Sequence, residues 1–141
     1  MRIRYSTLIM VFTLIVFLTI ASAEGPYKKV QPVLDTTKTV MEENLLQSDG
    51  SSLHITSTIV TIDPGEVTGW HKHGVPLYIY ILSGEVTVDY GEKGMRTFGP
   101  GDSFMESMAH WHRGTNRGKE PVRILCVYMG SDKAKNVILK D

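Results

Sequence analysis

Two stretches of this 141-residue chain decide its fold: GEVTGWHKHGVPLYIYILSG at positions 65–84 and GDSFMESMAHWHRGTN at positions 101–116. In the first, His71 and His73 are two residues apart, and side chains at that spacing leave the same face of a strand. Such a pair alone is weak evidence for a metal site. His112 follows 39 residues after His73, beyond three turn signals, so an antiparallel meander can return it beside the pair. The pattern predicts that three imidazoles meet at one metal ion.

The chain after Ser51 consists of short runs rich in Val, Ile, Thr and Tyr, separated by turns that contain glycine or proline. This texture is typical of an antiparallel barrel or sandwich, and the lack of helical patterns between the runs excludes a parallel α/β sheet. We therefore predict an all-β fold, with strands at residues 54–62, 68–73, 77–82, 85–90, 95–98, 102–106, 112–114 and 122–129.

Residues 24–50 are expected to form an N-terminal arm. Pro26 and Pro32 interrupt regular structure there, so the arm can add at most an edge strand. Residues 38–47 can form a helical turn, although the pattern is short.

The first segment of the chain has the features of a secretory signal peptide. Arg2 and Arg4 precede a thirteen-residue run of apolar residues and threonines at 8–20, and Ala-Ser-Ala at 21–23 allows cleavage before Glu24. The alternative is an uncleaved anchor, but the run is shorter than the ~20 apolar residues that span a bilayer. The sequence therefore predicts a periplasmic or secreted protein with no stable membrane insertion after cleavage of residues 1–23.

Composition limits the classes of partner. Without residues 1–23 the chain has 118 residues, enough for one domain, with 13 Lys and Arg against 15 Asp and Glu. A net charge of −2 with mixed signs argues against a nucleic-acid partner, because phosphate binding needs a concentrated basic face. Cys126 is the only cysteine, so no intramolecular disulfide can form, and its apolar surroundings at 122–128 predict a packed thiol.

The two histidine stretches resemble the paired motifs of the cupin superfamily, in particular small exported cupins of the type-2 conserved-barrel family. The first cupin motif is Gly, five residues, His-x-His, three or four residues, Glu, six residues, Gly, and its positions here are Gly65, His71, His73, Leu77 and Gly84. The second is Gly, five residues, Pro-x-Gly, two residues, His, three residues, Asn, and its positions here are Gly101, 107–109, His112 and Asn116.

The resemblance covers residues 51–129. It implies an antiparallel double-stranded β-helix, the jelly-roll or cupin barrel, at residues 51–131, followed by a C-terminal tail at 132–141. It also implies one divalent ion bound by His71, His73 and His112. Because many cupins are dimers, a homodimer is expected, with the outward-facing Tyr78 and Tyr80 as the expected contact surface.

Two departures from the motifs bear on the chemistry. Ser107-Met108-Ala109 replaces Pro-x-Gly, which alters a turn, and Leu77 occupies the position of the usual glutamate ligand. Three neutral imidazoles leave a divalent ion its full charge, so a water bound to it is more acidic, with a pKa of about 7 on a comparable zinc site. Zinc, copper, nickel, manganese and iron all suit such ligands.

Glu106, six residues before His112, is the candidate catalytic residue. It can act as a fourth ligand, as a partner of an imidazole N–H or as a general acid or base, and the alternative is an ordinary carboxylate at the rim. His110 is expected at the surface or beside the site, and Trp70 and Trp111 are expected to point away from it. Leu77, Ile79 and Ile81 are expected to line the barrel.

Three functions fit these features: a metal-dependent oxygenase, isomerase or lyase that acts on a small organic molecule, a protein that binds a metal or small ligand without catalysis, and a barrel with a vestigial site that acts by association. Cupins support many unrelated reactions, so the fold does not choose among them.

Overall fold

The computed structural model describes residues 25–38 and 42–141, and the proposed signal peptide lies outside these residues. The strands are β1 (Lys29–Thr36), β2 (His54–Ile62), β3 (His71–Lys72), β4 (Leu77–Ser83), β5 (Val86–Asp89), β6 (Met95–Phe98), β7 (Ser103–Met105), β8 (Arg113–Thr115), β9 (Val122–Gly130) and β10 (Ile138–Leu139). One 3-10 turn, η1 (Gly91–Lys93), is the only helical element in the described residues. The strand pairs are antiparallel, so the predicted all-β antiparallel fold is confirmed. In the described part of the chain, no helix is long and apolar enough to cross a membrane.

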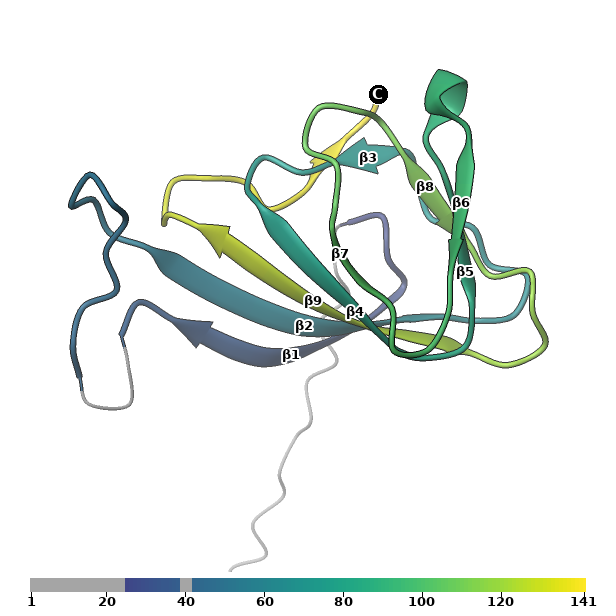
Figure 1. Ribbon diagram of the computed structural model, residues 1–141, viewed down its shortest axis with the longest axis horizontal. Coiled ribbons are helices and arrows are strands. Elements are labelled where there is room, and N and C mark those ends of the chain that lie inside the picture. The colour runs from purple at the N-terminus through teal and green to yellow at the C-terminus, as the bar shows by residue number, and fades with distance from the viewer. Residues whose placement is uncertain (1–24, 39–41) are drawn as a thin grey trace, which may run out of the picture.

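The strands form two larger sheets and a short ribbon. The five-stranded sheet has the order β1-β2-β9-β4-β7, the three-stranded sheet has the order β6-β5-β8, and β10 pairs with β3. Figure 1 shows the three-stranded sheet standing beside the long strands of the larger one, with β3 near one end of the space between them. That space is lined by apolar side chains of both sheets, so the core lies between the sheets.

Strand β4 shows how the sequence pattern directs side chains into this core. Leu77, Ile79 and Ile81 are buried, whereas Tyr80 on the same strand is exposed and Tyr78 is half-buried. This alternation is the one that a period of two predicts for a strand with one covered face. The predicted inward and outward faces of this strand are confirmed.

The N-terminal arm adds strand β1 to the edge of the larger sheet, as the sequence allowed. The pairing shifts register between Pro32 and Leu34, because proline cannot donate to the ladder and is accommodated at an edge or a bulge. The predicted helical turn at 38–47 is wrong for the described residues. Those residues make isolated bridges, and their backbone donors bond to other segments, as Leu45 N does to Thr37 O at 2.8 Å.

The last residues of the chain return to the histidine end of the barrel. β3 is shorter than predicted, and it pairs with β10 on one side while His71 bridges to His112 on the other. The segment expected as a plain tail therefore supplies a strand.

Gly84, the last glycine of the first histidine stretch, has a φ of 72°, and a side chain there would lie 2.8 Å from Pro121 O. Only glycine fits this turn without strain.

Candidate metal centre

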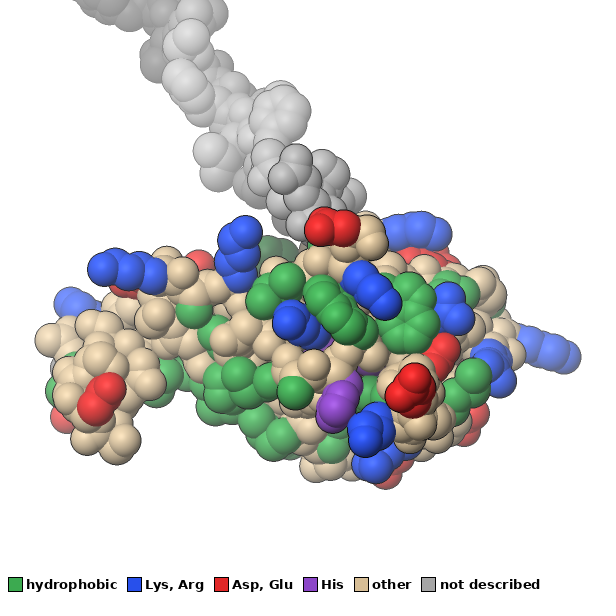
Figure 2. All heavy atoms as spheres, turned by 90° about the horizontal axis from the view of Figure 1, so that it is seen from above, with side chains coloured by type: hydrophobic (Ala, Val, Ile, Leu, Met, Phe, Trp, Pro, Cys, Tyr) green, Lys and Arg blue, Asp and Glu red, His purple; other side chains and the backbone are tan. Residues whose placement is uncertain are grey.

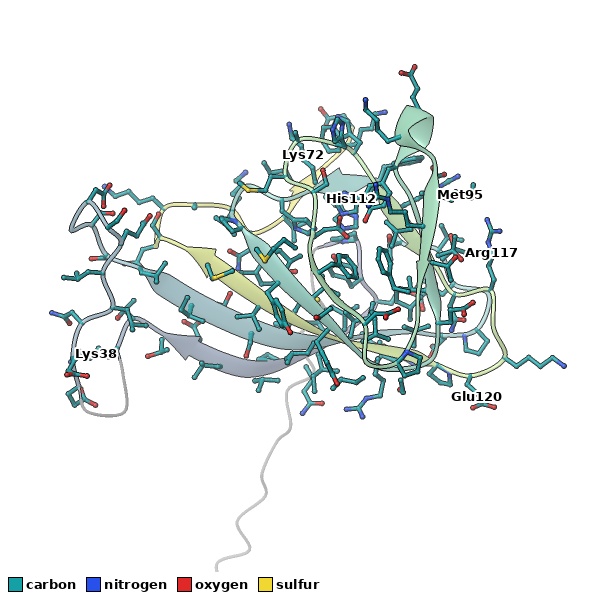
Figure 3. All side chains as sticks on the ribbon, in the orientation of Figure 1. Lys38, Lys72, Met95, His112, Arg117 and Glu120 are labelled. Atoms are coloured by element: carbon teal, nitrogen blue, oxygen red, sulfur yellow. The ribbon has the colours of Figure 1, made fainter. Side chains whose placement is uncertain are left out.

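Three histidines from two separate stretches meet in the interior. His71 lies on β3, His73 follows it, and His112 immediately precedes β8. The backbones of His71 and His112 exchange two hydrogen bonds of 2.9 Å, which hold the two stretches in register. All three side chains are buried, and their candidate ligand atoms lie within 4.8 Å of one another. Figure 3 shows His112 pointing into the space between the sheets, whereas Lys72 lies at the outer end of the barrel.

Backbone carbonyls fix the tautomer of all three rings. Nδ1 of His71 lies 2.8 Å from Gly69 O, Nδ1 of His73 lies 3.1 Å from Asn136 O, and Nδ1 of His112 lies 3.0 Å from His110 O. A carbonyl oxygen can only accept, so each Nδ1 carries a hydrogen and donates it. In a neutral ring the Nε2 atom is then an unprotonated lone pair.

In their neutral Nδ1–H form, two of the rings turn unprotonated Nε2 atoms towards each other. Nε2 of His112 lies 3.2 Å from Nε2 of His73. A hydrogen bond between these atoms would need an additional proton on one ring, and burial lowers the pKa of His73 to about 4. Burial, with a smaller contribution from the neighbouring imidazoles, likewise lowers the pKa of His71 to about 3. The rings are therefore suited to share a metal cation, whose bond uses the lone pairs directly.

Glu106 is buried beside this cluster, so it is not an ordinary rim carboxylate. Its Oε1 accepts hydrogen bonds from the Tyr90 hydroxyl at 2.9 Å and from the Ser107 backbone at 2.7 Å. Its other oxygen, Oε2, lies 3.9 Å from Nε2 of His112. Burial raises the pKa of Tyr90, and the Glu106 carboxylate raises it further, so Tyr90 stays protonated and keeps donating. The arrangement fixes one carboxylate oxygen and leaves the other turned towards the histidines.

Tyr27 is a member of the site that sequence reasoning missed. Its hydroxyl lies 2.9 Å from Nε2 of His71, and it also hydrogen-bonds to the side chain of Tyr128. The arm is held in place by a 3.4 Å hydrogen bond from Gly69 N to Pro26 O. Tyr27 belongs to no periodic pattern in the sequence. Its role depends on where the arm docks, so no local signal could have identified it.

The chamber around the ligand atoms is small and mainly apolar. Its volume is about 40 Å³, which holds a few waters at most. Leu77, Ile79 and Ile81 form part of its wall, as predicted, and Leu77 is fully buried at the position where the motif has its glutamate. Glu106 also lines the chamber and lies beside Leu77, with its backbone N 2.9 Å from Leu77 O, so the negative charge lost at Leu77 is supplied from the end of the neighbouring strand β7.

Of the remaining candidates, Cys126 lines the chamber, whereas His110, Trp70, Trp111 and Asn116 are outside its lining. The side chain of His110 is exposed, and only its carbonyl contacts His112. Trp70 stacks with Arg113, and Trp111 stacks with Lys72, on the outside of the cluster. Cys126 is a buried free thiol whose pKa burial raises to about 12, so it is not a nucleophile. Asn116 of the second stretch is structural, with its amide nitrogen 2.9 Å from Ile62 O and 2.8 Å from Glu120 O.

Solved structures with similar folds include enzymes. An uncharacterized conserved protein with a double-stranded β-helix domain from Klebsiella pneumoniae is 18% identical, with a TM-score of 0.55 over 79% of this chain and 85% of that one. The DMSP lyase DddQ from Ruegeria pomeroyi is 22% identical, with a TM-score of 0.53 over 61% of this chain and 43% of that one. The polyketide cyclase RemF from Streptomyces resistomycificus is 21% identical, with a TM-score of 0.52 over 69% of this chain and 70% of that one.

At these identities the likeness shows a common fold and nothing more about chemistry. A comparison with curated proteins finds no match. The cupin-domain family model matches residues 58–128, half of the chain, including both histidine stretches. The antiparallel barrel, the converging histidines and this match together lead to one conclusion: the protein belongs to the cupin family.

Proposed function

We propose that this protein is an exported metal-dependent enzyme that acts on a small organic molecule, with one divalent ion bound by His71, His73 and His112. The observation that carries the proposal is the orientation of the three rings. Each donates Nδ1–H to a carbonyl, and their candidate ligand atoms converge in a buried chamber. Burial lowers the pKa of His71 and of His73, which keeps both rings neutral and able to coordinate at neutral pH.

The protein groups around the ion would position substrate and move a proton. A bound divalent ion would polarise a substrate oxygen and acidify a bound water. Glu106 directs Oε2 into the chamber while Tyr90 and Ser107 hold Oε1, so this carboxylate can accept or return a proton at a fixed position. Proton transfer at such a carboxylate favours an isomerase or lyase over an oxygenase. The apolar wall at Leu77 and Ile79 excludes bulk water from the reacting atoms.

The metal, the compartment and the assembly are parts of the same proposal. An exported protein meets zinc, copper or nickel more readily than ferrous iron, although iron and manganese also bind imidazole and carboxylate donors. The half-buried Tyr78 and exposed Tyr80 on the outer face of β4 support a homodimer that packs through this strand.

Elemental analysis of the mature exported protein, purified without a metal-binding tag, tests this proposal. We expect one metal per chain, with loss of the metal in His71→Ala and His112→Ala. His110→Ala is the matched control, because that side chain is exposed and outside the cluster. A folded wild-type protein that stays metal-free after incubation with zinc, copper, nickel and manganese, or with iron under anaerobic conditions, would overturn the proposal.

A second candidate is a protein that binds a metal or a small ligand without catalysis, and the small chamber favours it. A volume of 40 Å³ beside the histidines accepts an ion and a few waters but only a small part of an organic substrate. Glu106→Gln separates the two candidates once a substrate is found. The enzyme loses turnover and keeps its metal, whereas a binding protein has no turnover to lose.

A further inference from the structure

Strands β6 and β7 are consecutive in the chain and yet do not pair with each other. A turn at Gly99–Asp102 joins them, but β6 pairs only with β5 and β7 pairs only with β4. Each is therefore an end strand of its own sheet, and the barrel is open along this seam. A pocket of 300 Å³ lies there, lined by residues of both strands and of η1. We call it the entry basin; the argument uses its residues Tyr90, Lys93, Arg96, Phe98, Phe104 and Glu106.

Two phenylalanines line the entry basin, and the basin adjoins the histidine chamber. Phe98 and Phe104 are stacked, with ring centroids 3.9 Å apart and an interplanar angle of 18°. Both rings line the pocket and make this part of it apolar, which suits a planar or aliphatic body. Phe104 and Glu106 line both the entry basin and the chamber, so they form the boundary between the two. A ligand on the phenylalanines can therefore reach the Glu106 carboxylate.

Two cations at the basin make no ion pair in the described part of the structure. Neither Lys93 nor Arg96 makes an ion pair or a side-chain hydrogen bond with another described residue. Two acidic side chains of this region have other partners, since Asp89 pairs with Arg113 and Glu106 accepts a hydrogen bond from Tyr90. Glu92, beside Lys93 in η1, makes no ion pair with either cation. Figure 2, viewed from the end of the barrel that carries β3 and η1, shows basic side chains distributed among hydrophobic and a few acidic ones. An anion of matching size would gain attraction here without displacing a partner.

We propose that the entry basin is the substrate-binding subsite of this protein and that it selects a small organic carboxylate with a flat apolar body. The carboxylate lies between Lys93 and Arg96, the body rests on Phe98 and Phe104, and the far end of the molecule meets Glu106. The proposal rests on the proposed function for the chemistry at that far end. The subsite itself is independent of the metal, because none of its cations or aromatic rings is a metal ligand.

A titration of the metal-free protein with two probes of the same shape tests the subsite. Benzoate and benzamide are added separately at low salt, and backbone amide shifts are followed by NMR. We expect benzoate to bind about tenfold more tightly than benzamide, with shifts concentrated at β6, β7 and η1. Arg96→Gln and Lys93→Gln should each weaken benzoate binding about threefold and leave benzamide unchanged, as expected for exposed charge pairs. Arg123→Gln is the matched control, because Arg123 is an exposed strand arginine outside the pocket.

Three results would each overturn the proposed subsite. They are equal affinities for benzoate and benzamide, a loss of benzoate affinity in Arg123→Gln as large as in Arg96→Gln, and no binding of benzoate. The same titration in His112→Ala separates this proposal from the metal proposal. If benzoate binding persists there while elemental analysis finds no metal in the wild type, the metal centre fails and the subsite stands. If the metal is present and benzoate is not preferred, the subsite fails and the metal centre stands.

Discussion

Histidine has opposite protonation behaviour in two regions of this molecule. In the buried cluster each ring places one nitrogen against a backbone carbonyl, and burial lowers the pKa of His71 and of His73. At the surface, both ring nitrogens of His54 face carboxylates, Nε2 towards Asp35 and Nδ1 towards Asp132 at 2.8 Å. The hydrogen bond to Asp35 is the main cause that raises the pKa of His54.

The difference lies in what accepts the ring protons. One carbonyl needs a single N–H, which a neutral imidazole supplies, and the second nitrogen is left as a lone pair. Two carboxylates need two N–H groups, which only the imidazolium supplies. The buried rings are thereby suited to coordinate a metal, and the surface ring is suited to hold a proton that joins β1, the start of β2 and the segment after β9.

The largest expected effect is on metal affinity. His112→Ala removes one of three converging nitrogens, so we expect the affinity for zinc to fall at least a hundredfold, more than a change in a supporting residue would cause. Competition with a chromophoric chelator measures it. His54→Gln is the control from the other region and should leave the affinity unchanged. A similar loss in both variants would contradict the distinction between the two regions.

The next effect concerns the residue that replaces the motif glutamate. Leu77→Glu places a carboxylate in an apolar wall, and we expect a loss of about 3 kcal/mol in the free energy of unfolding of the metal-free protein. Zinc should reduce that loss, because the new carboxylate then has a cation beside it. Urea denaturation with and without zinc measures both values, and Leu77→Gln supplies the uncharged comparison. A loss that zinc does not reduce would argue against an ion next to this position.

Acid should destabilise the metal-free protein through the buried histidines. Their native pKa values, about 3 for His71 and about 4 for His73, lie below the unfolded value of 6.5, so the unfolded chain binds more protons as the pH falls below 6.5. Stability therefore decreases from pH 6.5 towards pH 4, by about 2 kcal/mol per histidine at pH 5. Denaturation at several pH values measures the slope, and His71→Gln should reduce it. An unchanged slope in that variant would contradict the assignment of a neutral buried ring.

The smallest effect has the opposite dependence on pH. The native pKa of His54 is raised, so its contribution to stability is complete below the unfolded value and is lost as the pH rises through the native one. The difference in melting temperature between wild type and His54→Gln should therefore shrink as the pH is raised from 6 to 9. Asp132→Asn should show the same trend. A difference that grows with pH would mean that His54 is not held as an imidazolium.

Much of the fold and the ligand set could be predicted because the signals are local. The alternation of side chains in β4 identified Leu77, Ile79 and Ile81 as core residues. The histidine cluster was identified by two histidines that are two residues apart and by a third that follows after three turns. Each of these inferences needs only the direction of alternate side chains and the antiparallel return of a strand.

The parts that sequence could not determine depend on long-range docking. Glu106 was equally compatible with the rim and the interior, because the turn at 107–109 hides the phase of its strand. Tyr27 and Asn136 reach the histidines only because the arm and the C-terminal segment fold back onto them. The edges of β6 and β7 that border the entry basin likewise follow from how the strands divide between two sheets and from no single motif.

The most direct test of the account is the protonation state of the three buried rings. Long-range ¹H–¹⁵N NMR of the metal-free protein at pH 7 distinguishes protonated from unprotonated ring nitrogens. The account predicts three neutral imidazoles with hydrogen on Nδ1 and a lone pair on Nε2, and a shift of all three Nε2 resonances with one equivalent of zinc. An imidazolium or an Nε2–H ring among His71, His73 and His112, or Nε2 resonances that zinc leaves unmoved, would contradict it.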